Sequence, residues 1–81
     1  MLISDHYLVA QAESASDTTN FRYGTADALY IGGTGNVTVV LENDVAVLFA
    51  GAVVGTILPL RIKRVNSTNT AGSGYVALYR Y

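Results

Sequence analysis

The chain lacks most of the residue types that stabilise a very small domain. Its 81 residues contain no cysteine, no tryptophan, one proline and one histidine, His6. Without cysteine there can be no disulfides or thiolate metal sites, and one histidine leaves too few ligands for a structural zinc ion. A domain this small buries only about 60% of its unfolded surface, so it usually needs disulfides, a metal or partner subunits. Partner subunits remain, and the sequence therefore predicts a subunit of an oligomer.

Charge is also scarce. Charged residues make up 14% of the chain, against roughly 25% in an average soluble protein. The net charge of −1 and the pI of about 5.5 argue against sequence-independent nucleic-acid binding. Residues 45–54 are the longest apolar stretch and are far too short to span a membrane. The first residues lack the basic and apolar regions of a signal peptide. We therefore expect neither nucleic acid nor membrane as a partner.

The few charges are unevenly distributed along the chain. All six acids lie within residues 1–44, together with one base, Arg22. Residues 45–81 contain no acid and four bases, which are Arg61, Lys63, Arg64 and Arg80. Two interpretations follow. The two halves can fold together and neutralise each other, or a basic face can meet the acidic face of a neighbouring copy. A head-to-tail contact of the second kind can close into a ring.

A period of two in the apolar residues predicts an all-β fold. Residues 36–49 indicate a hairpin, because residues 36–42 alternate, Asn43-Asp44 supplies a turn and an apolar run returns. Further strands are expected at residues 28–31, 57–65 and 75–81, whereas residues 7–10 suit either a strand or a helical turn. Pro59 removes one ladder donor, so the strand at 57–65 should lie at an edge or contain a bulge.

Residues 13–25 are polar and follow neither a helical nor a strand period. We therefore expect an extended N-terminal arm over residues 1–25, followed by one β domain over residues 26–81. The fold class predicted for that domain is a small antiparallel β-sandwich or partly open barrel of five to six strands.

Nothing in the sequence assembles an active site, and we expect no enzyme, cofactor or metal. Gly32-Gly33-Thr34-Gly35 resembles a phosphate-binding loop, but such a loop needs a following helix and here a strand follows. Catalysis by a Ser/His/Asp set would have to use His6, close to the chain terminus. Glu42 and Asp44 are the only paired carboxylates, and a hairpin turn leaves them open to water.

Tyrosine is frequent, with six copies. The rings can close the core with their hydroxyls at its margin, or they can form a face for a partner or ligand. The C-terminal Tyr79-Arg80-Tyr81 is the group we expect to face a partner, so its deletion should impair assembly more than folding. A different alternative is a carbohydrate-binding module in which Tyr30, Tyr75 or Tyr79 stacks on a sugar.

Four segments occur in an order that resembles a known family. They are Ser16-Asp17-Thr18-Thr19, Ala28-Leu29-Tyr30-Ile31-Gly32-Gly33, Gly55-Thr56-Ile57-Leu58-Pro59-Leu60-Arg61-Ile62-Lys63-Arg64-Val65 and Val76-Ala77-Leu78-Tyr79. Between about residues 14 and 80 the chain resembles the head spike-base proteins of tailed phages and gene transfer agents. The resemblance implies a small, non-catalytic β protein on the outside of a phage-type capsid, where it seats a receptor-binding fibre.

The resemblance also implies partners and a location. We expect a homo-oligomer, with a pentamer favoured at a five-fold vertex and a trimer as the alternative. Its other partners would be the major capsid protein and a fibre protein, at the surface of a virion made in the bacterial cytoplasm. A capsid decoration or cement protein, bound between capsomers, is the nearer alternative function. The residues we expect at interfaces are Asp17, Thr18 and Thr19 in the arm, the basic Arg61, Lys63 and Arg64, and the C-terminal Tyr79, Arg80 and Tyr81.

Overall fold

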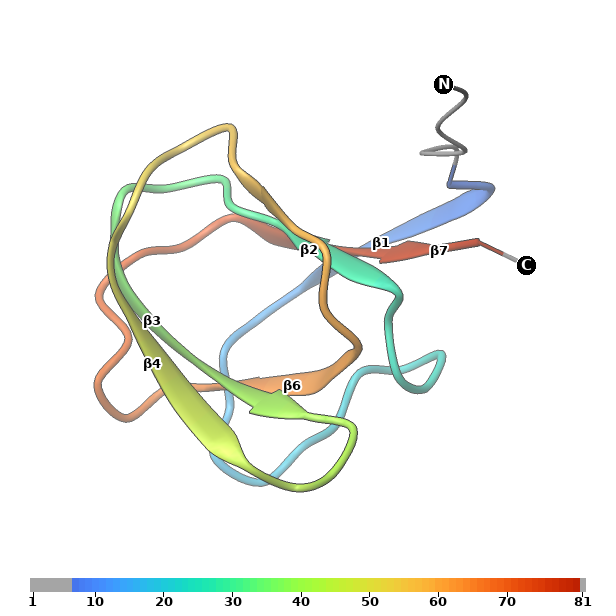
Figure 1. The fold of residues 1–81 in the computed structure, drawn as a ribbon, viewed down its shortest axis with the longest axis horizontal. Helices are drawn as coiled ribbons and strands as arrows, with labels where there is room; N and C mark the ends of the chain where they lie inside the picture. The colour runs from blue at the N-terminus through green and yellow to red at the C-terminus, as the bar shows by residue number, and fades with distance from the viewer. Residues whose placement is uncertain (1–6, 81) are drawn as a thin grey trace.

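The computed structural model describes residues 7–80 and shows an all-β protein (Figure 1). The strands are β1 (Val9–Glu13), β2 (Ala28–Tyr30), β3 (Gly35–Leu41), β4 (Ala46–Ala52), β5 (Ile57–Leu58), β6 (Ile62–Asn66) and β7 (Tyr75–Tyr79). Within this range no helix is long and apolar enough to cross a membrane. The predicted fold class is confirmed, because the strands form two antiparallel sheets that pack together.

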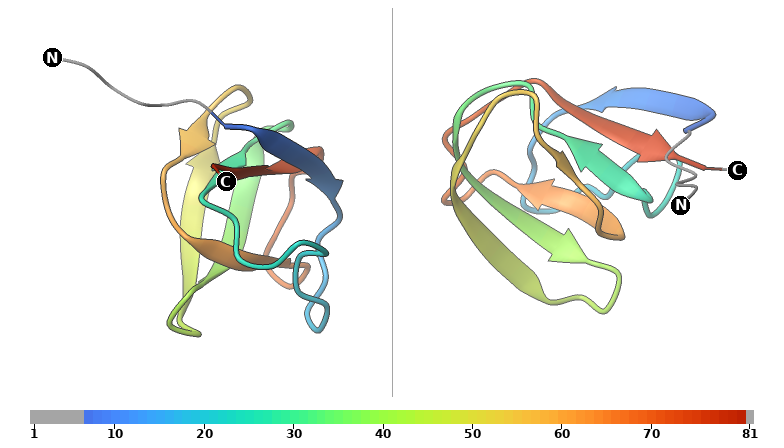
Figure 2. Two further views of the ribbon diagram at one scale, coloured as in Figure 1. Left: turned by 90° about the vertical axis from the view of Figure 1, so that its right-hand side faces the viewer. Right: turned by 45° about the horizontal axis from the view of Figure 1, so that its top comes forward.

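One sheet has four strands in the order β1-β7-β2-β5, and the other has three in the order β4-β3-β6. The C-terminal strand β7 therefore lies between β1 and β2 (Figures 1 and 2). The sheets are linked on one side by an isolated bridge between Ala26 and Ile62. The Ala26 amide donates to the Ile62 carbonyl at 2.7 Å, and the Ile62 amide returns a bond of 3.1 Å. This bridge gives the sandwich the character of a partly open barrel.

The hairpin predicted over residues 36–49 is present as β3 and β4. Its turn is closed by the amide of Asp44, which donates to the carbonyl of Leu41 at 2.9 Å. Asp44 has a φ of 66°, a left-handed conformation that Asp tolerates better than most residues. The Asn43 side chain accepts a bond of 3.3 Å from the Val45 amide. Asn43-Asp44 therefore suits this turn through both its backbone conformation and its side-chain bonding.

The single strand predicted over residues 57–65 is wrong. The segment is divided into β5, which belongs to the four-stranded sheet, and β6, which belongs to the three-stranded sheet. The division falls at Pro59, where the Leu60 amide donates to the Leu58 carbonyl at 2.9 Å and tightens the turn. Leu58 and Leu60 still pack against the core that contains Ile62. The alternation of apolar residues therefore continues across the turn at Pro59. For that reason the sequence does not show that the segment is divided into two strands.

The N-terminal segment also differs from the expected arm. Val9 to Glu13 pair with Tyr79 to Tyr75, so β1 is part of the sheet. Farther along, the Ser16 amide donates to the Val65 carbonyl at 2.7 Å and the Phe21 amide donates to the Lys63 carbonyl at 2.9 Å. These bonds occupy the edge of β6 that β3 leaves open. Residues 7–25 therefore belong to the domain, whereas His6 and the rest of residues 1–6 lie outside the described residues.

The core lies between the two sheets and draws on nearly every strand. Phe21, which is 5% exposed, enters this core from the segment between residues 13 and 25. Alternation in β7 buries Tyr75 and Tyr79. The residues of the main cluster are Phe21, Ala26, Leu29, Ile31, Val37, Val39, Ile62, Val65, Tyr75, Ala77 and Tyr79. Two tyrosines thus supply core volume that a larger protein would take from leucine and phenylalanine.

Two glycine-rich loops touch each other through their backbones. A Cβ atom added at Gly32 would lie 2.1 Å from the carbonyl oxygen of Gly74, and one added at Gly72 would lie 2.6 Å from the carbonyl oxygen of Gly33. Both distances are far below van der Waals contact, so the glycines are required by the close approach of the loops. The glycine run at residues 32–35 is therefore a packing feature of the fold.

We expect Gly32→Ala to destabilise the protein more than Gly51→Ala. The added methyl group at Gly32 must displace backbone, which costs about 3 kcal/mol. At Gly51, where φ is 67° and nothing lies within 4 Å of the added Cβ, only the left-handed conformation is penalised, by about 1 kcal/mol. Urea unfolding followed by circular dichroism measures both changes. Equal losses for the two variants would contradict the proposed loop contact.

Candidate functional site

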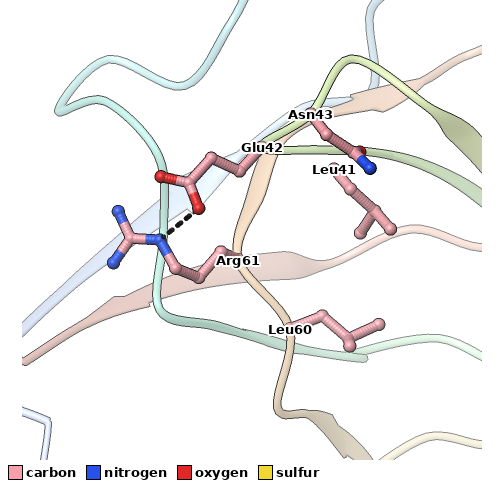
Figure 3. Close-up of a pocket in the computed structure, with 5 residues that line it drawn as sticks. All are labelled: Leu41, Glu42, Asn43, Leu60 and Arg61. Atoms are coloured by element: carbon pink, nitrogen blue, oxygen red, sulfur yellow. Dashed lines mark ion pairs between the residues drawn. The ribbon is translucent and has the colours of Figure 1, made fainter.

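The basic residues predicted at an interface are paired within the chain. Arg61 lies between two carboxylates, with Nη1 2.9 Å from Asp27 Oδ1 and Nε 3.1 Å from Glu42 Oε1 (Figure 3). Lys63 Nζ lies 2.5 Å from Asp44 Oδ1. Each pair joins a base of the C-terminal half to an acid of the N-terminal half. Of the two interpretations of the charge distribution, mutual neutralisation is confirmed for these residues.

Arg64 is held by amide oxygens. Its Nε donates to Asn66 Oδ1 and its Nη1 donates to Asn20 Oδ1, both at 2.9 Å. The second bond fastens the segment before Phe21 to β6. The charged groups of Arg61, Lys63 and Arg64 therefore already have partners in the same chain. The Arg61 side chain is 54% exposed, so its ion pairs are surface pairs that contribute about 0–1 kcal/mol each.

A shallow hollow of about 340 Å³ lies beside Arg61. It is lined by Leu41, Glu42, Asn43, Leu60 and Arg61 (Figure 3). The Glu42 carboxylate and the Arg61 guanidinium face each other across one side, and the two leucine side chains form the opposite side. The charged groups of the hollow therefore bind each other. Within residues 7–80 no three His, Cys, Asp or Glu side chains gather into a metal-binding group.

The predicted interface residues of the N-terminal segment also have internal partners. Asp17 Oδ1 accepts a bond of 3.0 Å from the Thr68 amide, and Oδ2 accepts one of 2.6 Å from the Thr68 hydroxyl. These bonds lower the pKa of Asp17 below its usual 3.8. The amides of Thr18 and Thr19 donate to Ser16 Oγ at 3.2 and 3.1 Å. Asp17 thus fastens the β6–β7 loop, while Thr18 and Thr19 remain exposed.

The prediction that Tyr79 faces a partner is wrong. Its side chain is fully buried, and its hydroxyl donates to the Gly24 carbonyl at 2.9 Å. The ring of Tyr23 meets it edge-on, with 6.3 Å between centroids. Deleting the last three residues would therefore remove part of the core, which argues against an effect on assembly that exceeds the effect on folding. Tyr75, which is 2% exposed, is equally unavailable as a sugar-stacking platform.

The remaining C-terminal predictions have a mixed outcome. Arg80 is exposed, its amide donates to Asp27 Oδ2 at 2.8 Å, and its guanidinium lies 5.7 Å from the centroid of the Tyr7 ring. Tyr81 lies outside the described residues. Tyr30 is partly buried at the end of β2. Of the C-terminal group, Arg80 is thus the described residue whose side chain reaches the surface.

The most unusual surface of the molecule was not among the predicted interfaces. Residues 45–55 contain no side chain that carries charge or a polar group. Large apolar side chains are nevertheless exposed there: Val45 is 48% exposed, Leu48 50%, Val53 57% and Val54 52%. The unbroken apolar run was the sequence signal for this surface. In a strand with one face in water, apolar and polar residues should alternate. We call residues 45–54 the β4 segment.

The backbone of the β4 segment is open on one side. β4 is the end strand of its sheet, and no other described strand lies beyond it (Figure 2). The Leu41 amide donates to the Val45 carbonyl at 2.9 Å, and the register continues with Val39 opposite Val47 and Val37 opposite Phe49. Hydrogen-bonded pairs alternate along an antiparallel ladder, so the backbone groups of Val45, Val47 and Phe49 face β3. Those of Ala46, Leu48 and Ala50 face outward.

Comparison with known proteins identifies no relative of this chain. The chain matches no family model, no curated protein and no solved structure. The resemblance to head spike-base proteins therefore stays a prediction from the sequence.

We expect Tyr79→Phe to destabilise the protein and Tyr75→Phe to leave its stability nearly unchanged. Removing the Tyr79 hydroxyl leaves the Gly24 carbonyl without its bond, at a cost of about 1 kcal/mol. The Tyr75 hydroxyl is buried beside Gly72, and no group among residues 7–80 makes a hydrogen bond of acceptable geometry with it. Burial of this hydroxyl raises the pKa of Tyr75 above its usual 10.0. Urea unfolding of both variants measures the difference, and a larger loss for Tyr75→Phe would contradict this assignment.

The stability of the protein should fall as the pH drops below about 4. The pKa values of Asp17 and Asp44 are both lowered from 3.8, so their stabilisation is present above pH 3.8 and is lost as the pH falls through the folded pKa values. Lys63 is the main cause at Asp44, whereas uncharged donors act at Asp17. High salt should therefore reduce the effect of Asp44→Asn but not that of Asp17→Asn. Unfolding curves between pH 2 and 6 test this, and two variants with equal salt dependence would contradict it.

Proposed function

We propose that the protein is a non-catalytic structural subunit whose function is assembly. The observation that carries this proposal is the β4 segment, an exposed apolar strand edge in a chain whose Arg61 and Lys63 are paired with acids of the same chain. Free edges of soluble proteins are usually protected by lysine, proline or a covering segment. β4 (Ala46–Ala52) contains neither lysine nor proline. An edge of this kind is a liability in a free monomer and is ordinary in a subunit that is covered after assembly.

The proposed site of assembly is the exterior of a phage-type capsid, at the oligomeric base of a head spike that seats a receptor-binding fibre. This part rests on the sequence resemblance over about residues 14–80. The low charge of the chain is compatible with it. The proposed partners are other copies of the chain, the major capsid protein and a fibre protein. On the capsid the proposed oligomer is a pentamer at five-fold vertices, with a trimer as the alternative.

A capsid decoration protein is the second candidate, because the same exposed strand edge would also suit a protein that clamps capsomers. The two candidates differ in their number of copies per particle. A spike base is restricted to the vertices, whereas a cement protein follows the much larger number of capsomers.

The proposal predicts that the purified protein binds purified capsids that lack it. Co-sedimentation measures binding, and quantitative mass spectrometry of washed particles gives the number of copies. We expect saturation at a number set by the vertices. Saturation at the number of capsomers would favour the decoration protein over the spike base. Absence of binding would contradict both candidate functions.

The basic residues provide a test of the capsid contact itself. A folded variant in which Arg61, Lys63 and Arg64 are all alanine should bind capsids at least 10-fold more weakly if their charges also contact the capsid or a neighbour. Thr70→Ala is a suitable control, because it removes an internal hydrogen bond to the Thr38 amide without removing a base. Normal binding by the triple variant would show that these bases serve the fold alone.

A further inference from the structure

We propose that β4 pairs with β4 of a second copy of the chain, antiparallel, about a two-fold axis at Leu48. The contact would join the two three-stranded sheets into one continuous sheet through their open edges. It is an isologous contact, in which the same surface is used on both copies. The proposal concerns the protein in solution and does not depend on the capsid assignment. A two-fold contact cannot close a ring of five or three copies, so the pentamer or trimer proposed on the capsid would use other contacts.

The backbone geometry of β4 fixes which register is possible. Ala46, Leu48 and Ala50 direct their amides and carbonyls away from β3, as the register with β3 requires. With the axis at Leu48, Ala46 lies opposite Ala50 of the second copy and Leu48 lies opposite its equivalent. Every outward residue therefore meets another outward residue. A shift of one residue would place outward groups against groups already bonded to β3, and the pairing would be lost.

The two-fold axis could also lie at Ala46 or Ala50, whose backbone groups face outward as well. The two ends of the strand exclude these registers. Asp44 lies in the hairpin turn with a φ of 66°, and Gly51 has a φ of 67° at the register shift between the pair of Val37 with Phe49 and the pair of Gly35 with Ala52. Between these two positions the outward-facing residues are Ala46, Leu48 and Ala50, and Leu48 is the middle one. An axis at Ala46 would run into the turn, and an axis at Ala50 would run into the bulge.

The side chains of β4 are complementary to themselves in this register. On the inner side, Val47 lies opposite Phe49 of the second copy, and the symmetry repeats that pair. Aromatic and β-branched residues form favourable cross-strand pairs. On the outer side, the two Leu48 side chains meet at the axis and are flanked by Ala46 and Ala50, which leave room for them. Residues 46–50 of β4 thus have a small residue at each end and three large residues between them.

Charge also favours a second copy at this edge rather than at the others. No ionisable side chain lies within residues 45–52, so no like charges face each other across the axis. β1 carries Glu13, β5 has only two residues, and the outer edge of β6 is bonded to Ser16 and Phe21. Among the edge strands of residues 7–80, β4 is thus the one that is long, carries no charge and has an unpaired backbone edge.

The first experiment is the solution mass of three proteins by light scattering. The wild-type chain of 8.6 kDa should have twice that mass. Leu48→Lys should be a monomer, because it places two like charges directly opposite each other at the axis. Val54→Lys is the matched control, since Val54 is 52% exposed against 50% for Leu48 and lies outside β4. It should remain a dimer. A monomeric wild type, or an oligomer indifferent to Leu48→Lys, would overturn the proposal.

The second experiment uses the absence of cysteine to test the register. In a hydrogen-bonded pair the two Cα atoms lie about 5.5 Å apart, which suits a disulfide. Leu48→Cys should therefore form a covalent dimer under mild oxidation at least 10-fold faster than Val54→Cys, as seen on a non-reducing gel. Equal rates would overturn the proposed axis. Capsid binding by a monomeric Leu48→Lys protein would leave the capsid proposal intact, so the two proposals can fail separately.

Discussion

The fold depends on the insertion of β7 between β1 and β2. The last strand of the chain pairs on one side with the first, through Val9 opposite Tyr79, and on the other with β2. It also places Tyr75 and Tyr79 in the core. The preceding loop can reach this position because Gly72 and Gly74 allow it to touch the backbone of Gly32 and Gly33. β7 can therefore take its central position only because the two loops touch closely. The packing of both sheets depends on that contact.

The second constraint is the small number of charges. Arg61 and Lys63 each bind acids from the first half of the chain, and Arg64 binds two asparagine side chains. These contacts fasten the hairpin turn and residues 20–27 to the start of β6. The β4 segment contains no charged residue, and it has apolar side chains exposed and one edge unpaired. The surface therefore combines a few charges that pair with each other and an apolar edge without any charge.

The sequence was informative wherever a local period or turn determined the structure. The hairpin of β3 and β4 and the buried face of β7 could be predicted because alternation and Asn43-Asp44 act over a few residues. The corner at Pro59 could not, since the apolar alternation is the same on both sides of it. The position of the segment before Phe21 could not be predicted, because two of its bonds to β6 come from backbone amides, which carry no sequence signal, and a third joins the distant side chains of Asn20 and Arg64. Tyr79 suits a core or an interface equally by composition, and only the position of its strand decides between them. The open edge of β4 was missed because strand order is a property of the whole fold.

The most direct test of the account is amide hydrogen exchange along β4, measured residue by residue at low and high protein concentration. In the monomer the amides of Val47 and Phe49 face β3 and should be protected, whereas those of Ala46, Leu48 and Ala50 should exchange fast. At high concentration the pairing of two copies should protect these three amides as well. Fast exchange of Ala46, Leu48 and Ala50 at every concentration would contradict the account, because the open edge would then have no partner in a second copy.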